Sequence, residues 1–197
     1  MKNIINIPFS KEAESVWDKT VPIVPQKNIT NAYLTSEIAE PSEYNEFCYL
    51  LSTASEAETF HIFLNTPGGI LDSAFMIVDA INNSKARVVA HLSGCVASAG
   101  TIIALACSEL IIADHIEFMV HNYSGGIAGK GHEMKARQEF VDASLQKAFH
   151  TLYAGFLTKE EMQEVIDGKD MWMGKAEVLS RFKGTFSSKK GKSKKDA

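Results

Sequence analysis

Short apolar runs alternate with amphipathic stretches along most of this chain, from Asn31 onward. Strands are expected over 32–35, 60–65, 87–92, 109–112 and 118–121, those over 60–65 and 87–92 being buried. Helices are expected over 42–54, 71–82, 99–107, 132–156 and 158–166, the last with Thr158 as its cap. Strands that alternate with helices through short Gly-rich turns predict βαβ units and a largely parallel sheet.

The two ends of the chain differ from this pattern. Residues 1–28 contain Pro8, Pro22 and Pro25 and are expected to be irregular, apart from a short helix over 11–19. A folded domain is expected over 29–184, because 197 residues suffice for one domain with a proper core. The segment 185–197 is rich in lysine and is predicted to be a disordered tail.

Composition narrows the classes of function. The chain is 45% hydrophobic and 22% charged, with a net charge of −4, and five of its lysines lie in the last eleven residues. The remaining body is therefore acidic, which argues against nucleic-acid binding. No run is long and apolar enough to span a bilayer and no signal peptide is visible, so a cytoplasmic location is the expectation.

Cysteines and known ligand motifs add little chemistry. Cys48, Cys95 and Cys107 form no Cys-x-x-Cys pair, and the last two are expected to be buried thiols in a reducing compartment. The chain has no phosphate-loop or dinucleotide fingerprint and no His/Cys cluster with metal-ligand spacing. We therefore expect neither a cofactor nor a metal.

Ser98 is the polar residue that interrupts the apolar pattern most abruptly. It lies in Gly94-Cys95-Val96-Ala97-Ser98-Ala99-Gly100, between an expected strand and an expected helix. A sharp strand-to-helix turn would push its hydroxyl outward, into the partial positive charge of the helix N-terminus. This placement suits a nucleophile and the oxyanion that it creates. The alternative is an N-cap serine, whose hydroxyl accepts a bond from a backbone N–H.

A serine nucleophile needs a base that takes its proton and an acid that orients the base. His61 and His91 lie within apolar strands, where a structural role is expected, whereas His121 ends a strand and precedes the Gly-rich loop 124–131. His121 is therefore the candidate base.

The acid is less well defined. The candidates are Asp114, Asp142, Asp167 and Asp170. Asp170 adjoins the apolar 171–173 and could hold an imidazole from a partly buried position, but a surface turn with two solvated acids is the alternative.

Gly68-Gly69 could provide part of an oxyanion site. The pair follows a strand and Pro67, and glycine permits backbone angles that let an N–H point at a substrate. A simple turn is the alternative.

Four segments, in order, resemble motifs of the Clp protease proteolytic subunit (ClpP) family of serine peptidases. They are Asn65-Thr66-Pro67-Gly68-Gly69, similar to Asn-Ser-Pro-Gly-Gly; 94–100, similar to Gly-x-Ala-Ala-Ser-Met-Gly; Met119-Val120-His121-Asn122 with Gly125-Gly126, similar to Met-Ile-His-Gln and Gly-Gly; and Asp170-Met171-Trp172-Met173 with Glu177, similar to Arg-Asp-x-Phe-Met with a downstream Glu-Ala. The resemblance covers residues 31–180. It implies a ClpP/crotonase-type α/β fold, with βαβ units around a mainly parallel sheet and a protruding handle helix.

The resemblance also implies a role for individual residues. Ser98 would be the nucleophile, His121 the general base and Asp170 the orienting acid. The backbone N–H groups of Gly69 and Ala99 would form the oxyanion hole.

A second group of residues would serve contact between rings. Gly125, Gly126 and the start of the following helix would form the handle. Glu133 and Lys169 occupy the places of an acid and an arginine that pair in the family, although lysine lacks the bidentate fork of arginine.

The function implied is that of a serine endopeptidase that cleaves peptides or unfolded proteins inside a homo-oligomeric chamber. The expected assembly is a heptameric ring or a tetradecamer, with an AAA+ unfoldase as a partner that would bind the ATP.

Several features depart from the family. Residues 1–28 do not resemble its axial pore loops, Ala99 replaces a methionine, and Arg181-Phe182-Lys183-Gly184 with the lysine tail replaces its usual end. Such divergence suggests a phage-encoded branch, with capsid-protein processing as its role. A crotonase-type acyl-CoA enzyme and an inactive ring-forming scaffold remain alternatives.

Overall fold

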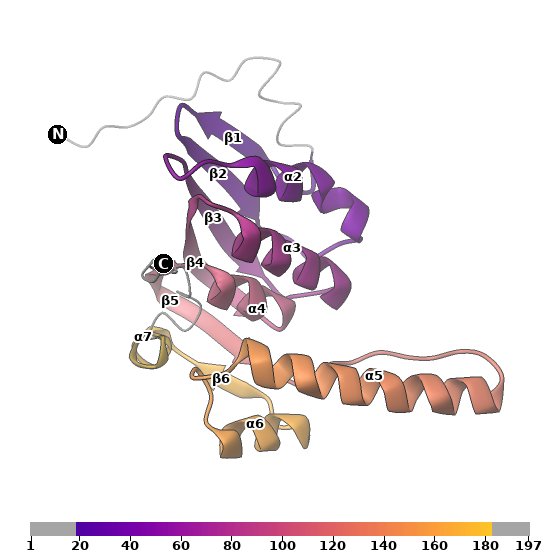
Figure 1. The fold of residues 1–197 in the computed structure, drawn as a ribbon. Coiled ribbons are helices and arrows are strands. Elements are labelled where there is room, and N and C mark those ends of the chain that lie inside the picture. Colours follow the sequence, from indigo (N-terminus) through magenta and orange to yellow (C-terminus); the bar gives the residue numbers. More distant parts are fainter. Residues whose placement is uncertain (1–18, 183–197) are drawn as a thin grey trace, which may run out of the picture.

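A computed structural model describes residues 19–182, with a six-stranded sheet at its centre (Figure 1). The strands lie side by side in chain order: β1 (Ile23–Gln26), β2 (Ile29–Leu34), β3 (Thr59–Thr66), β4 (Arg87–Ala97), β5 (Glu109–Val120) and β6 (Met171–Met173). The four strands β2 to β5 are parallel, whereas β1 and β6 are antiparallel edges. The prediction of an α/β fold with a mainly parallel sheet is confirmed.

Three of the helices cover one face of the sheet, and the longest helix projects from it. The helices are η1 (Pro41–Tyr44), α2 (Asn45–Thr53), α3 (Leu71–Asn83), α4 (Ala99–Ala106), α5 (Gly131–Leu152), α6 (Lys159–Ile166) and α7 (Lys175–Arg181). Figure 1 shows α2, α3 and α4 on one face of the sheet, and α5 extending away from it beside the segment that follows β5. In the part of the chain that the structure describes, no helix has the length and apolarity needed to cross a membrane.

The sheet buries only one of its two faces under helices. In β3, Phe60, Ile62 and Leu64 are buried, whereas His61 and Phe63 on the other face are only partly covered. The strand expected to be buried over 60–65 is therefore buried on one face only. His and Asn alternate there with apolar residues, and that alternation is typical of a half-buried strand.

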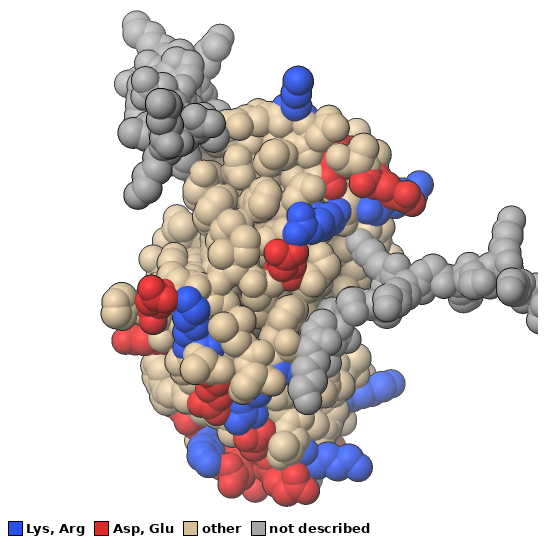
Figure 2. Space-filling view, turned by 90° about the vertical axis from the view of Figure 1, so that its left-hand side faces the viewer, with Lys and Arg blue, Asp and Glu red and all other residues tan. Residues whose placement is uncertain are grey.

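Aromatic rings line this second face. The rings of Tyr33 and Phe63 stack with centroids 4.7 Å apart, and those of Phe63 and His91 with centroids 4.4 Å apart. Figure 2 shows few charged side chains over the middle of the molecule on the side that it views, and many at the lower end.

Three expectations about strands need correction. Residues 23–26 form β1 although residues 1–28 were expected to be irregular, because Pro25 is tolerated in an edge strand. The strand expected over 87–92 continues to Ala97. The strands expected over 109–112 and 118–121 are one strand, β5, whose polar centre bulges where the register shifts from Leu92–Ile112 to Gly94–Ile116.

Helix ends also differ from expectation. The helix expected over 132–156 ends at Leu152, and Gly155, with φ 78°, lies in the turn that follows. Thr158 caps α6 as expected, and its hydroxyl and the Glu161 carboxylate accept each other's backbone N–H groups. Most of the helix expected over 11–19 and all of the tail expected over 185–197 lie outside the described residues.

A paired carboxylate joins α6 to α7 and makes stability dependent on pH. Arg181 donates to both oxygens of Glu161, at 2.7 and 2.8 Å, and this bonding lowers the pKa of Glu161 from 4.5 to about 2. A lowered pKa contributes stability that is complete above the ordinary value and is lost as the pH falls from 4.5 toward 2. Glu161→Gln should therefore lower the free energy of unfolding at about pH 7 and by a smaller amount at about pH 3.

Urea denaturation of both proteins at the two pH values tests this prediction. Glu139→Gln, on the exposed surface of α5, is the matched control and should change little. An equal loss at both pH values for Glu161→Gln would contradict the account.

Candidate active site

Ser98 alone connects β4, which ends at Ala97, to α4, which begins at Ala99. Its backbone has φ 53° and ψ −123°, and Ser98 and Lys27 are the only non-glycine residues with positive φ between residues 19 and 182. Such a conformation costs about 1–3 kcal/mol and persists only where the surroundings enforce it. Although Ser98 occupies the N-cap position, its side chain makes no capping bond, so the alternative of an N-cap hydroxyl is wrong.

Hydrogen bonds from three directions enforce this turn. The Ser98 N–H donates to the carbonyl of Met119 in β5, at 2.8 Å. The Ser98 carbonyl accepts the N–H and the hydroxyl of Thr101, at 2.9 and 2.7 Å. The hydroxyl of Tyr153, just after α5, lies 2.5 Å from the Thr101 hydroxyl, and both side chains are buried. The backbone of Ser98 is thus fixed by β5, α4 and Tyr153 together.

Gly68 packs against this turn, and Gly69 packs against Ile38, both too closely for any other residue. A Cβ on Gly68, whose φ is 100°, would lie 2.6 Å from the Ser98 Cβ and 3.1 Å from the Ala99 nitrogen. A Cβ on Gly69, whose φ is 144°, would lie 2.3 Å from the Ile38 carbonyl oxygen. Within residues 19–182, the N–H groups of Gly69 and Ala99 have no hydrogen-bond acceptor. Two unpaired amide donors therefore lie beside Ser98.

Strand register brings His121 and Asp170 to the same edge of the sheet. Ala97 in β4 is opposite Met119 in β5, so Ser98 and His121 both follow the carboxyl ends of neighbouring parallel strands. Val120 is the last residue of β5 and pairs with Met171, the first of β6. His121 and Asp170 thus lie one residue beyond the same antiparallel pair. Register accounts for the convergence of three residues that are far apart in sequence.

The three side chains are not bonded to one another in the described chain. Ser98 and His121 are half-exposed and line one pocket, whereas Asp170 is exposed and does not line it. Among residues 19–182, no hydrogen bond or ion pair joins Ser98, His121 and Asp170.

The other candidate acids have partners elsewhere. Asp114 pairs with Lys175 at 2.6 Å, Asp142 accepts from Tyr123 and Gln138, and Asp167 accepts from Gln163 at 2.8 Å. Of the four candidates, Asp170 alone has no hydrogen-bonding or ionic partner among the described residues.

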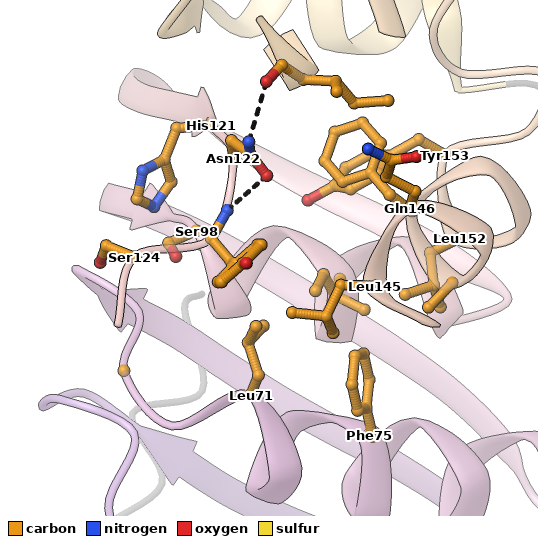
Figure 3. A pocket seen from close by; sticks show the side chains of 16 residues that line it. Leu71, Phe75, Ser98, His121, Asn122, Ser124, Leu145, Gln146, Leu152 and Tyr153 are labelled. Atoms are coloured by element: carbon orange, nitrogen blue, oxygen red, sulfur yellow. Dashed lines mark hydrogen bonds between the residues drawn. The ribbon is translucent and has the colours of Figure 1, made fainter. Parts of the chain in front are cut away.

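An apolar wall extends the pocket away from Ser98 (Figure 3). In Figure 3, Ser98, His121 and Ser124 lie together at one end. The rest of the pocket is lined largely by apolar side chains from α3, α4 and α5: Leu71, Phe75, Ile102, Leu145, Phe149 and Leu152. The pocket can accept an apolar side chain next to a reacting group at Ser98.

The residues expected at the handle lie on and beside α5. Gly125 and Gly126 are exposed in the segment before α5, and Glu133 lies in its first turn. Glu133 lies 3.7 Å from the Lys130 ammonium, and Lys169 pairs with Glu164 at 2.5 Å. Glu133 and Lys169 are thus not paired within one chain.

Some features of the site escaped the sequence reasoning. Asn122 and Tyr123 follow His121 and bind two different elements, since Asn122 donates to Ile166 and Tyr123 donates to Asp142. The motif containing Asn122 was recognised, but no pattern in it indicated a partner 44 positions away.

The remaining histidines and cysteines lie apart from the pocket. His61 and His91, expected to be structural, bond to each other at 2.8 Å, and burial lowers the pKa of both. Cys107 is buried as expected, but Cys95 is only half-buried. Among the described residues, no three His, Cys, Asp or Glu side chains are grouped so as to hold a metal ion.

The hydrogen bond between the hydroxyls of Tyr153 and Thr101 is expected to stabilise the turn at Ser98. Tyr153→Phe leaves the ring in place but removes a buried partner of Thr101, so the free energy of unfolding should fall by about 1–3 kcal/mol. Urea denaturation measures the change, and Tyr49→Phe, whose residue is 65% exposed, serves as the control. A loss no larger than in the control would show that the bond does not stabilise the fold.

Comparison with known proteins agrees with this architecture. The Clp protease family profile matches residues 27–180. The chain is 29% identical over 135 residues to the ATP-dependent Clp protease proteolytic subunit of Streptococcus agalactiae serotype V. The aligned region covers 66% of this chain and 68% of that protein. The same subunits of Streptococcus equi subsp. equi and of Streptococcus pyogenes serotype M5 are 28% and 27% identical over 142 residues, with the same shares covered. With most of its sheet and all of its site elements inside the matched region, the chain belongs to the Clp protease family.

Proposed function

We propose that this protein is a serine endopeptidase in which Ser98, His121 and Asp170 form the catalytic triad. The observation that carries the proposal is the strained backbone of Ser98, with His121 on the same pocket. The N–H groups of Gly69 and Ala99, which have no acceptor among the described residues, support it. Strain of this kind is typical of a nucleophile held on a strand-to-helix turn.

Each residue has a distinct role in the proposed reaction. Ser98 Oγ attacks the peptide carbonyl while His121 accepts its proton, and the negative charge that forms on the carbonyl oxygen is stabilised by the N–H groups of Gly69 and Ala99. His121 then protonates the leaving amine, and the acyl-enzyme on Ser98 is hydrolysed by water. Asp170 holds the imidazole in the productive tautomer and stabilises its charged form.

The apolar wall favours a particular class of substrate. Leu71, Phe75 and Leu145 offer no charged partner to the residue before the scissile bond. An apolar or aromatic side chain at that position would displace water from the wall, whereas a charged one would be desolvated without compensation. We therefore expect cleavage after apolar residues of peptides or unfolded proteins.

Assembly into rings is part of the proposal. α5 is 22 residues long and contains no buried residue, and Phe140 on it is 72% exposed. An isolated helix in water gains little from propensity alone, so such an arm is stabilised by packing on another copy of the chain. A homo-oligomer of one or two heptameric rings would also enclose a chamber, and Glu133 of one ring could pair with Lys169 of the other. An AAA+ unfoldase would deliver substrates, and the protein would act in the cytoplasm.

Replacement of the nucleophile is the direct test. Ser98→Ala should lower the rate of cleavage of a fluorogenic peptide by a factor on the order of 10⁴ to 10⁶ and abolish labelling by a fluorophosphonate. Ser124→Ala is the matched control, because Ser124 lines the same pocket but has no role in the proposed reaction.

The outcomes separate the alternatives. Wild-type cleavage by Ser98→Ala would refute the proposal. Assembly without labelling or cleavage would favour a scaffold with an idle triad, an alternative consistent with the lack of hydrogen bonds among the three side chains. Acyl-CoA turnover that does not need Ser98 would favour a crotonase-type enzyme.

The oligomeric state gives an independent prediction. Light scattering of the full chain should show an assembly, because the exposed surface of α5 requires a partner. The resemblance to the Clp protease family implies that its mass is seven or fourteen times that of one chain. A monomer at high protein concentration would contradict the proposed rings without bearing on the chemistry of Ser98.

A further inference from the structure

Asn122 bridges the segment that carries His121 and the segment that leads to Asp170. Its Nδ2 donates to the carbonyl of Ile166 at 2.9 Å, and its Oδ1 accepts the N–H of Tyr123 at 2.9 Å. Figure 3 shows both bonds beside His121. The amide side chain thus uses one donor and its acceptor, and the donor reaches across to another element.

Ile166 is the last residue of α6, and its helix ends in a tightly bonded turn. The N–H of Lys169 donates to the carbonyl of Glu164, and the N–H of Gly168 donates to that of Val165, both at 3.0 Å. Gly168 has φ 106°, a conformation that favours glycine. This pattern is a Schellman motif, which satisfies the carbonyls of Glu164 and Val165.

The turn leaves the carbonyl of Ile166 to accept from Asn122, and it determines the backbone position of Asp170. Asp170 follows Lys169 directly, and the Lys169 ammonium binds the Glu164 carboxylate at 2.5 Å, which joins the two ends of the turn again. Asp167-Gly168-Lys169, a candidate for a plain surface turn from sequence, is an exposed turn that these bonds hold between α6 and Asp170.

We propose that Asn122 is a positioning residue that sets the distance and angle between the His121 imidazole and the Asp170 carboxylate. This inference rests on the proposed function. The ladder between β5 and β6 ends at Val120 and Met171, so no strand pairing restrains the two residues beyond that point. The bond from Asn122 to Ile166 is the next cross-link between the two segments. The bond between Asn122 and Ile166 and the pairing of Val120 with Met171 thus form a frame of two cross-links, one on each side of His121 and Asp170.

The mechanism predicts coupling between Asn122 and Asp170. Without its amide, the His121 segment and the Asp170 segment can move independently, and misplacement by about 1 Å costs about 100-fold in rate. Asn122→Ala should therefore lower kcat by about 10- to 100-fold with little change in KM. In an Asp170→Asn background the same substitution should have little further effect, because the interaction on which it acts is already gone.

A double-mutant cycle on the full chain tests this inference. The cycle compares wild type, Asn122→Ala, Asp170→Asn and the double variant in cleavage of a fluorogenic peptide, with thermal unfolding measured for each. Asn83→Ala is the matched control, since Asn83 Nδ2 also donates to a backbone carbonyl, that of Asp79 at 2.8 Å, but on the outer surface of α3. Equal losses from Asn122→Ala in both backgrounds, or no loss in the wild type, would overturn the positioning role.

Hydrogen exchange separates failure of this inference from failure of the proposed function. Asn122→Ala should accelerate amide exchange in both 121–124 and 167–171, and unchanged exchange in 167–171 would overturn the tether whatever the activity. Cleavage that persists in Ser98→Ala would instead refute the proposed function, and the exchange measurement would still test the tether.

Discussion

The register of three neighbouring strands is the constraint on which the rest of the site depends. Ala97 pairs with Met119, and Val120 pairs with Met171, so β4, β5 and β6 have these ends at one edge of the sheet. A shift of one residue in any of these pairings would turn the following side chain to the opposite face. The burial of Val96, Phe118 and Met173 resists such a shift, since each would lose its place in the core. The hydrophobic core and the candidate active site are therefore determined by the same pairing.

The strained backbone of Ser98 is compatible with a stable fold because hydrogen bonds from neighbouring elements hold it in place. Met119 and Thr101 hold the backbone of Ser98, and the buried Tyr153 holds Thr101. Gly68 fits against the turn, and Gly69 against Ile38, only because glycine lacks a side chain. The backbone at Ser98 is thus fixed without a substrate, which is the condition that the oxyanion hole proposed for Gly69 and Ala99 requires.

Parts of the molecule near this edge of the sheet are exposed in a single chain. Asp170 is exposed, and α5 projects with all of its residues at least partly accessible (Figure 1). Such exposure agrees with the proposed assembly. In the proposed rings, contacts on α5 and on the segment before it would act on the loop that carries His121, while the frame around Asn122 would transmit the position of α6 to Asp170.

The residue patterns predict much of this architecture, but they do not predict its long-range hydrogen bonds. Apolar spacing located α3 and α4 almost to the residue, and Thr158 located the start of α6, because these signals are local. The sequence does not predict β5 as one strand because its bulge carries the polar Asp114 and His115. It does not predict β1 because Pro25 in an edge strand has no local signature that distinguishes it from a loop.

Side-chain pairing was the least accessible feature. Asn122 with Ile166 and Thr101 with Tyr153 are separated by 44 and 52 positions, and only the fold decides which partners meet. The importance of Ser98, His121 and Asp170 was inferred from resemblance to the family. Their placement at adjacent strand ends follows from the register.

The most direct test of the account is the structure of the assembled protein after reaction with a fluorophosphonate, determined by cryo-electron microscopy. The account predicts phosphorus bound to Ser98 Oγ, a phosphoryl oxygen that accepts the N–H groups of Gly69 and Ala99, and His121 hydrogen-bonded between Ser98 and Asp170. An adduct on another residue, or an Asp170 carboxylate out of hydrogen-bond reach of His121 in every subunit, would contradict it.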